Sequence, residues 1–338
     1  MINNKYKNNN KRTPKLETEF SYTRKTILEN LNINPEWVVL LKKNPIPQII
    51  KKGNPAEVFL LLKNVYQLTY KHALYRLVES AVFKQQAIHR VANKNYIPKN
   101  KEFDSELSFY FQLQKIHQLV NLGATDYLDT IKIEIIKLMN FQDENGRFPM
   151  NYHHHAHTCN LLINLGLEGN KLIDKAIHWI LTRQREDGGW IHRNNVPRST
   201  NYKSTKSCIW TTAEVSLLLS KRKIFRNSQN LFKANSFLID NYLNSNKSTL
   251  LSKSDAWECL SINHKSEHMF AGGTLKLLEI LLNSKNIDIK IIKKMFNWMI
   301  NQQMDNSLFP KIANKQPISD ILVTNRFLAV IKKYFAVI

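Results

Sequence analysis

The sequence contains few of the residues that make turns and covalent cross-links. Its 338 residues include only 9 glycines and 10 prolines, too few for the many tight turns of an all-β chain. The three cysteines, Cys159, Cys208 and Cys259, are odd in number and far apart. This spacing argues against a disulfide framework and favours a reducing compartment. The shortage of glycine and proline favours an all-α fold, and the cysteine pattern favours an intracellular protein.

Long hydrophobic runs are also missing. No uninterrupted apolar segment approaches the roughly 20 residues that a membrane-spanning helix needs. The N-terminus, MINNKYKNNNKRTPK, lacks the apolar centre of a signal peptide. We therefore expect a cytoplasmic protein whose residues 1–18 form a disordered basic tail, because this segment has nothing to bury.

Acidic residues are scarce relative to basic ones. The chain has 27 Asp and Glu against 49 Lys and Arg, a formal net charge of +22. An excess of this size can serve nucleic acid or an anionic membrane surface. The lysines are scattered among asparagines and isoleucines, and no nucleic-acid-binding signature is present, so nucleic acid is not expected as a partner. A generic solvated surface is the simpler interpretation, and peripheral contact with an anionic membrane is the alternative.

What the sequence does have is a repeated polar turn. The three copies are FQDENGRFP (141–149), RQREDGGWI (183–191) and QQMDNSLFP (302–310). They share a glutamine, an acid two residues later, a glycine or serine, and an aromatic residue. These shared positions are Gln142, Glu144, Gly146 and Phe148 in the first copy, Gln184, Glu186, Gly188 and Trp190 in the second, and Gln303, Asp305, Ser307 and Phe309 in the third.

Amphipathic segments precede each copy of the turn. Residues 109–123, 157–166 and 273–284 carry apolar side chains at helical spacing, and a second helical stripe then leads to each glutamine. A degenerate unit covers roughly 209–255, and residues 318–335 resemble a half-length unit. The repeated unit is therefore a helical hairpin followed by a polar turn.

The turn is expected to join neighbouring hairpins. Its aromatic ring can cover the glutamine amide and an adjoining helix end, while the acid and the following Asn or Asp can cap the next helix. Paired helices of this kind stack into an open solenoid or close into a ring, and the aromatic turn favours closure. We therefore predict an all-α fold, an incomplete α/α barrel or toroid of four to five hairpins over residues 101–338. An extra N-terminal helical region is predicted over residues 19–100.

The turn from Gln184 to Trp190 resembles the repeat motif of the superfamily of squalene/hopene cyclases and protein prenyltransferase β-subunits. The resemblance covers about residues 105–338, and the pattern is closest to prokaryotic prenyltransferase/squalene-oxidase repeat proteins. It implies an α/α toroid, with inner helices around a central cavity and outer helices outside. A similar motif occurs in other α/α toroids, such as some polysaccharide lyases and thioester domains.

The catalytic motifs of that superfamily are absent. Class II cyclases protonate an alkene with an Asp-x-Asp-Asp cluster, and this chain has no such run. Prenyltransferase β-subunits bind zinc through Asp-x-Cys and a later His, whereas Asp255 and Cys259 have the wrong spacing. The resemblance therefore implies the fold and leaves open whether the chain is an enzyme.

A histidine cluster is the most unusual local feature. Residues 151–159 read NYHHHAHTC, and imidazole serves as a metal ligand or as an acid–base group. In a toroid the starts of the inner helices lie around one rim, which predicts a set of cavity-rim candidates: His157, Cys208, Trp210, His268 and Asp320. His155, His157 and Asp320 are weak catalytic candidates, and His157, Cys208 and His268 could hold zinc. The simpler alternative is that these residues are solvated or serve packing.

The predicted inner helices are rich in Leu, Ile and Phe. This composition favours a cavity that binds or acts on an isoprenoid or other apolar ligand, such as a lipid. Two alternatives remain: a non-catalytic scaffold for protein partners, and a carbohydrate-active toroid with paired acids in its cavity. The lining of the cavity discriminates among them.

Overall fold

The computed structural model describes residues 14–93, 105–125, 129–192, 206–244, 257–261, 272–284, 288–314 and 318–337. Their regular structure is almost entirely helical, as predicted. The exception is a short antiparallel pair, β1 (Phe309–Pro310) with β2 (Ser319–Asp320). Most of the predicted tail, residues 1–18, lies outside the described residues, and α1 (Pro14–Asn30) begins at Pro14.

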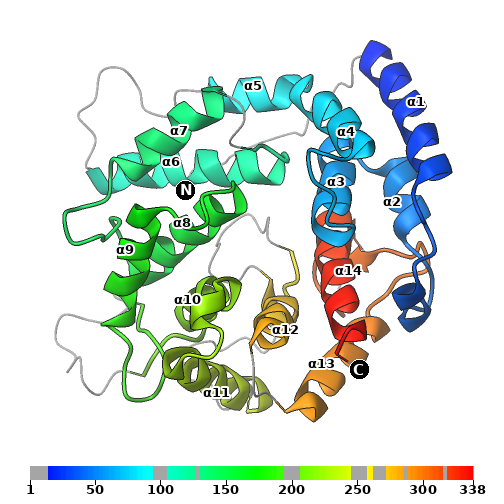
Figure 1. Ribbon diagram of the computed structural model, residues 1–338. Helices are drawn as coiled ribbons and strands as arrows, with labels where there is room; N and C mark the ends of the chain where they lie inside the picture. Colours follow the sequence, from blue (N-terminus) through cyan, green and yellow to red (C-terminus); the bar gives the residue numbers. More distant parts are fainter. Residues whose placement is uncertain are drawn as a thin grey trace.

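The helices form two concentric layers around a common axis (Figure 1). The inner layer contains α3 (Pro55–Leu60) with the π-turn η2 (Leu61–Val65), α6 (Ser105–Asn121), α8 (Tyr152–Asn164), α10 (Ile209–Lys221), α12 (Gly273–Asn283) and α14 (Ile321–Phe335). The outer layer contains α2 (Ile46–Lys52), α4 (Ala73–Phe83), α7 (Asp129–Met139), α9 (Lys171–Leu181), α11 (Gln229–Leu243) and α13 (Ile289–Asn301). The remaining elements are η1 (Glu36–Leu40), η4 (Lys223–Phe225) and α5 (Gln86–Ala92), which links α4 to α6.

Consecutive inner helices pack side by side from α6 through α8, α10, α12 and α14 to α3 and η2. The end of α6 also lies next to α3, so the inner helices form a complete ring. A Cβ on Gly123 would lie 3.2 Å from the ring of Phe59. The predicted α/α toroid is therefore confirmed.

The core lies between the two layers. The predicted stripes on the outer helices are buried, for example Ile173, Ile177 and Ile180 on α9. On the other side of this core, Phe327 of α14 contacts Phe296 of α13, with ring centroids 5.7 Å apart. The apolar surface buried between the two layers stabilises their packing, by roughly 25 cal/mol for each Å² removed from water. Within the described chain, none of the helices combines the length and apolar character that crossing a membrane requires.

The glutamine of each polar turn joins two hairpins. Its side-chain amide donates one hydrogen bond to a carbonyl inside the turn and another to a carbonyl at or just before the first turn of the next outer helix. The acceptors are Gly146 and Leu172 for Gln142, Gly188 and Asn230 for Gln184, and Ser307 and Lys43 for Gln303, at 2.7–2.9 Å. The same contact therefore recurs in all three copies.

The third copy connects the two ends of the chain. The Lys43 backbone N–H also donates to Oε1 of Gln303, at 3.1 Å. This places α2 where the outer helix after α13 is expected, and α3 packs against α14. The sequence predicts residues 19–100 as an extra region, whereas the structure makes α2 and α3 part of the ring. The acceptor at Lys43 is a backbone carbonyl, which leaves no mark in the sequence.

The aromatic residues of the turns occupy equivalent sites. Phe148, Trp190 and Phe309 are all buried. Their backbone N–H groups donate to side chains in the first turn of the next inner helix, namely Nδ1 of His155, Oγ1 of Thr212 and Oγ1 of Thr324, at 3.0–3.1 Å. Trp190 Nε1 also donates to the Ile180 carbonyl near the end of α9. The predicted contact with a helix end is thus confirmed for Trp190.

The predicted capping role of the turn acids is wrong. Glu144, Glu186 and Asp305 are exposed, and the N-cap positions of α8, α10 and α14 are occupied by other residues, Asn151, Cys208 and Asp320. The polar side chains at Asp143, Asp187 and Asn306 accept hydrogen bonds from backbone N–H groups of their own turns, and Asp187 also accepts from the Ser207 N–H just before α10. Asn151 and Asp320 cap α8 and α14.

The turn conformation predicts opposite effects for two substitutions. Gly188 has φ 86°, and a Cβ there would lie 2.5 Å from the Lys233 carbonyl oxygen, while Ser307 occupies the equivalent position at φ 68°. We expect Ser307→Gly to raise the free energy of unfolding by about 0.5–1 kcal/mol, because it relieves left-handed strain. Gly188→Ala should lower it by about 2 kcal/mol or more. Urea denaturation measures both, and destabilisation by Ser307→Gly would show that the turns are not equivalent.

Candidate functional site

The inner helices enclose a cavity of about 470 Å³. Small-molecule sites in proteins occupy roughly 300–1,000 Å³, so the cavity is large enough for a metabolite or a short lipid. Side chains from every inner helix line it, and η2 contributes Lys63 and Asn64. Its apolar lining includes Leu60, Val120, Leu161, Leu217 and Val330.

The cavity also has a charged lining. Its charged members are the cations Lys63, Lys221, Lys276, Arg326 and Lys333 and the carboxylates Glu214 and Glu279. The apolar wall expected from the Leu-, Ile- and Phe-rich inner helices is therefore present only in part. Many of those apolar side chains, Phe327 among them, face the outer helices and form the core between the layers.

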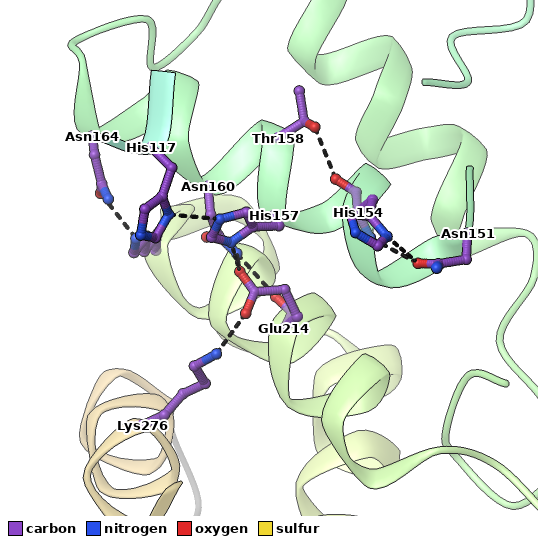
Figure 2. Close-up of polar contacts among 10 residues, drawn as sticks. His117, Asn151, His154, His157, Thr158, Asn160, Asn164, Glu214 and Lys276 are labelled. Atoms are coloured by element: carbon purple, nitrogen blue, oxygen red, sulfur yellow. Dashed lines mark hydrogen bonds and ion pairs between the residues drawn. The ribbon is translucent and has the colours of Figure 1, made fainter. Parts of the chain in front are cut away.

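One charged cluster is centred on Glu214 of α10 (Figure 2). Lys276 of α12 donates to Oε2 of Glu214 at 2.6 Å, and Asn160 of α8 donates to Oε1 at 2.9 Å. His157 Nδ1 lies 3.1 Å from Oε1, and His157 Nε2 lies 3.0 Å from Nδ1 of His117. The cluster thus links α6, α8, α10 and α12 across the wall of the cavity.

Glu214 is held ionised by its neighbours. Burial alone would raise the pKa of this carboxyl, because a charge is poorly solvated in the interior. Lys276 and His157 together outweigh burial and hold the pKa of Glu214 well below its usual value. A buried carboxylate with these partners is fixed in position, since removing either partner would leave an uncompensated charge.

A second cluster surrounds Glu279 of α12. Arg326 Nη2 of α14 donates to Glu279 Oε2 at 2.9 Å, and the nearby Lys221 and Lys333 also interact with this carboxylate. Burial would raise the pKa of Glu279, but Arg326 and Lys221 lower it further than burial raises it. Burial also lowers the pKa of Lys221 and Lys333, with partial compensation from Glu279. Three cations therefore surround one carboxylate.

The predicted rim residues do not come together around the cavity in the structure. His157 lines the cavity, whereas Trp210 packs against Trp257 with ring centroids 5.0 Å apart. The Cys208 N–H donates to the Trp190 carbonyl at 2.8 Å, and Asp320 caps α14 through the Val323 N–H. His268 lies outside the described residues. Of the described rim candidates, only His157 is among the cavity-lining residues.

His155 has a structural environment. Its Nδ1 accepts from the Phe148 N–H at 3.1 Å, and its Nε2 donates to the Ala176 carbonyl at 2.9 Å. Both ring nitrogens are therefore used to hold the first polar turn against α9. The Nδ1 atom of His155 accepts the hydrogen bond that threonine hydroxyls accept in the other two copies.

The predicted zinc set cannot be assembled from the described side chains. Within that part of the chain, no group of three or more His, Cys, Asp and Glu side chains is placed to hold a metal ion. His268, the third member of the predicted set with His157 and Cys208, falls outside it. The zinc hypothesis therefore remains a prediction.

Several cavity residues were not predicted from the sequence. They are His117, Asn160, Glu214, Lys221, Lys276, Glu279, Arg326 and Lys333. Glu214 in AEVSLLL and Lys276 in GTLKLL are each the one charged residue of a largely apolar helix segment. A charge isolated in a buried helix is rarely tolerated without a partner or a function, and this signal could have identified both residues.

Comparisons with known proteins give structural neighbours only. No protein-family model matches the chain, and no curated protein matches it. The apo structure of the type II terpene cyclase MstE from Scytonema aligns at a TM-score of 0.44 with 12% identity, covering 96% of this chain and 100% of that one. A substituted form of MstE with geranylgeranyl dihydroxybenzoate, its substrate, aligns at 0.30 with 10% identity, covering 73% and 95%.

A third neighbour is a form of MstE in complex with merosterolic acid A, a product, at a TM-score of 0.28 and 11% identity, covering 96% and 99%. These neighbours are type II terpene cyclases. Because the TM-scores are low, the ring architecture rests on this chain's own contacts.

The environment of His155 predicts a pH dependence. Burial lowers the pKa of His155 from 6.5 to about 4. The unfolded chain therefore binds this proton more readily, and stability is fully present above about pH 6.5 and falls as the pH drops towards 4. We expect a loss of about 3 kcal/mol from this residue over that range.

The matched substitution is His155→Thr. It introduces the residue that occupies the equivalent position of two other inner helices, Thr212 in α10 and Thr324 in α14. Denaturation at pH 7 and at pH 4.5 should show a smaller pH-dependent loss in this variant than in the wild type. His178→Thr, at an exposed position on α9, should keep the wild-type loss. An unchanged loss in His155→Thr would contradict the proposed environment.

Proposed function

We propose that the central cavity binds an anionic amphiphile, a ligand with a negatively charged head group and an apolar chain. The observation that carries this proposal is the excess of cations at Glu279, where Arg326, Lys221 and Lys333 surround one carboxylate. The head group occupies this end of the cavity. The chain extends along the apolar lining.

The charge argument concerns desolvation. Lys221 and Lys333 are only partly exposed, and burial lowers the pKa of both, so the surrounding groups compensate their charge incompletely. Two opposite unit charges 4 Å apart attract by about 4 kcal/mol at the effective dielectric constant near a protein surface. An anionic head group would therefore gain more here than at an exposed lysine.

Two hydrogen bonds support this position for the head group. Lys221 Nζ donates to Asn164 Oδ1 at 2.9 Å, and Lys333 Nζ donates to Asn283 Oδ1 at 2.7 Å. Neutral amides orient the two ammonium groups without cancelling their charge. Both lysines lie in the last turn of inner helices, α10 and α14.

The apolar chain is the part of the ligand that the sequence already favours. Leu161, Leu217 and Val330 supply apolar surface from three different inner helices. Because the polar turn resembles that of squalene/hopene cyclases, an isoprenoid is the apolar chain that we propose. The carbohydrate alternative is less well supported, since Glu214 and Glu279 are each paired with a cation. The scaffold alternative leaves the charged cavity without a role.

Octyl sulfate is a suitable probe, because it combines a permanent anion with an apolar chain. Calorimetric titration should show binding of octyl sulfate and much weaker binding of octyltrimethylammonium, which has the same chain and the opposite charge. We expect Lys221→Ala and Lys333→Ala each to weaken octyl sulfate binding about tenfold, equivalent to about 1.4 kcal/mol.

The matched control is Lys290→Ala, which removes an exposed lysine of α13. It should leave the affinity unchanged, since the protein's overall positive charge falls equally in all three variants. Equal binding of the two probes, or an effect of Lys290→Ala as large as that of Lys333→Ala, would overturn the proposal.

A further inference from the structure

We infer that the rim of the cavity is a docking surface for an anionic lipid membrane. The cavity opens to solvent where the inner helices end, because its exposed lining residues, Asn64, Gln67 and Asn164, lie at or next to the ends of η2 and α8. The segments that follow the inner helices therefore form the rim. This surface is distinct from the ligand site, and it requires no ligand in the cavity.

Exposed apolar side chains gather on the rim. Each of them lies within four residues of a side chain that lines the cavity. They are Tyr70 (54% exposed), Ile224 (71%), Phe335 (36%) and Val337 (61%), which follow the lining residues Gln67, Lys221 and Lys333. Single exposed apolar side chains are common on soluble proteins, whereas a group of them around one opening marks an interaction surface.

The turn η4 holds Ile224 at the surface. Its neighbour Phe225 packs against the core, and Ile224 is left exposed. Nε of Arg226 donates to the Ser220 carbonyl at 3.0 Å, which fixes this turn to the end of α10. Ile224 is therefore presented to solvent by an ordered turn, and its exposure does not depend on a loose loop.

The other two rim segments are fixed in similar ways. Nη1 of Arg76 donates to the carbonyls of Tyr70 and Lys71, both at 2.8 Å, and so holds the segment after η2. In the last turn of α14, the ring of Tyr334 stacks on a phenylalanine ring of α13 with centroids 4.1 Å apart, and the next residue, Phe335, is left exposed. In α14, as in η4, one aromatic ring anchors the segment and its neighbour faces solvent.

Basic residues accompany the apolar ones. Lys71 and Lys223 are exposed, and no aspartate or glutamate occurs in residues 66–72, 222–228 or 332–337. An anionic membrane surface attracts lysine and arginine, while apolar side chains enter the boundary between head groups and acyl chains. A fluid acyl layer accommodates four separate apolar side chains without a matching shape. This combination therefore favours a membrane over an acidic protein as the partner.

The three segments form one continuous side of the rim. Nζ of Lys332 donates to the Val65 carbonyl at 2.9 Å, which brings the end of α14 beside the segment after η2. Burial is the main cause of the lowered pKa of Lys333, and repulsion from Arg226 adds to it, so η4 also lies near the end of α14. The docking side therefore runs from η2 past α14 to η4.

The acids around the rim do not oppose this surface. Asp174 pairs with Arg222, which is itself buried. Asp288, which follows α12, caps α13 through the Lys290 N–H. Glu168 is exposed, but it belongs to the segment after α8, beyond the docking side.

Vesicle sedimentation without ligand tests the surface in the full chain. The protein should bind vesicles that contain phosphatidylserine and phosphatidylcholine, it should not bind vesicles of phosphatidylcholine alone, and added salt should weaken the binding. The high net charge of the protein would produce the same pattern from any face. The place of contact is therefore tested by substitutions that leave the charge unchanged.

Ile224→Asn and Val337→Asn each remove an apolar side chain of the rim without altering charge. We expect each to lower the vesicle partition coefficient about fivefold, because part of an apolar side chain no longer leaves water. The matched control is Ile136→Asn, which changes an isoleucine of the outer helix α7 that is 57% exposed. This control should keep the wild-type partition coefficient.

A second pair of variants tests the charges. Lys223→Glu changes an exposed lysine of the rim, and Lys293→Glu changes an exposed lysine of α13 by the same amount of charge. We expect Lys223→Glu to weaken vesicle binding at least fivefold more than Lys293→Glu, because attraction to the membrane surface falls off within roughly a Debye length.

The inference is overturned if wild-type protein does not bind vesicles containing phosphatidylserine, or if neither rim variant binds more weakly than Ile136→Asn. Equal effects of the two lysine variants would mean that the overall charge, and not the rim, makes the contact. Should Ile224→Asn not fold, Val337→Asn provides the same comparison near the end of α14. Vesicle sedimentation contains no octyl sulfate, so failure of this inference and failure of the proposed function are observed separately.

Discussion

The structure depends on the two hydrogen bonds that each turn glutamine donates. One bond closes the turn on itself, and the other reaches a backbone carbonyl at or just before the first turn of the next outer helix. A single amide therefore fixes both the turn and the position of the neighbouring hairpin. Each bond contributes only about 1 kcal/mol, but an unpaired buried amide would cost more, so the pairing specifies one arrangement.

Ring closure determines what the inner helices face. Their apolar sides pack against the outer layer, and the sides that remain point towards the axis. Charged groups are tolerated there because they pair across helices, as Glu214 does with Lys276 and Glu279 with Arg326. The two clusters differ in balance: Glu214 is matched by its partners, whereas Glu279 is outnumbered by cations. Cations therefore outnumber carboxylates at the Glu279 end of the cavity.

The sequence predicts the parts of this fold that depend on local pattern. The repeated glutamine and aromatic positions identify the turns, and helical spacing identifies the buried faces of α9 and α13, because both signals lie within one hairpin. The role of residues 43–65 in the ring is not predictable in this way, since Gln303 binds a backbone carbonyl 260 residues away. Most of the residues that line the cavity were also not predicted from the sequence. Which face of α10 or α12 meets the axis depends on the curvature of the ring, which a single helix does not encode. Sequence analysis singled out His157 but not its partners His117 and Glu214.

Hydrogen exchange measured by mass spectrometry tests the central claim, that the third polar turn closes the ring. In Gln303→Leu the account predicts faster exchange both in residues 43–52 and in α14, at opposite ends of the chain. In the matched variant Gln142→Leu, faster exchange should be confined to α8 and the start of α9, the equivalent neighbours of the first turn. Wild-type exchange of residues 43–52 in Gln303→Leu would contradict closure by this turn.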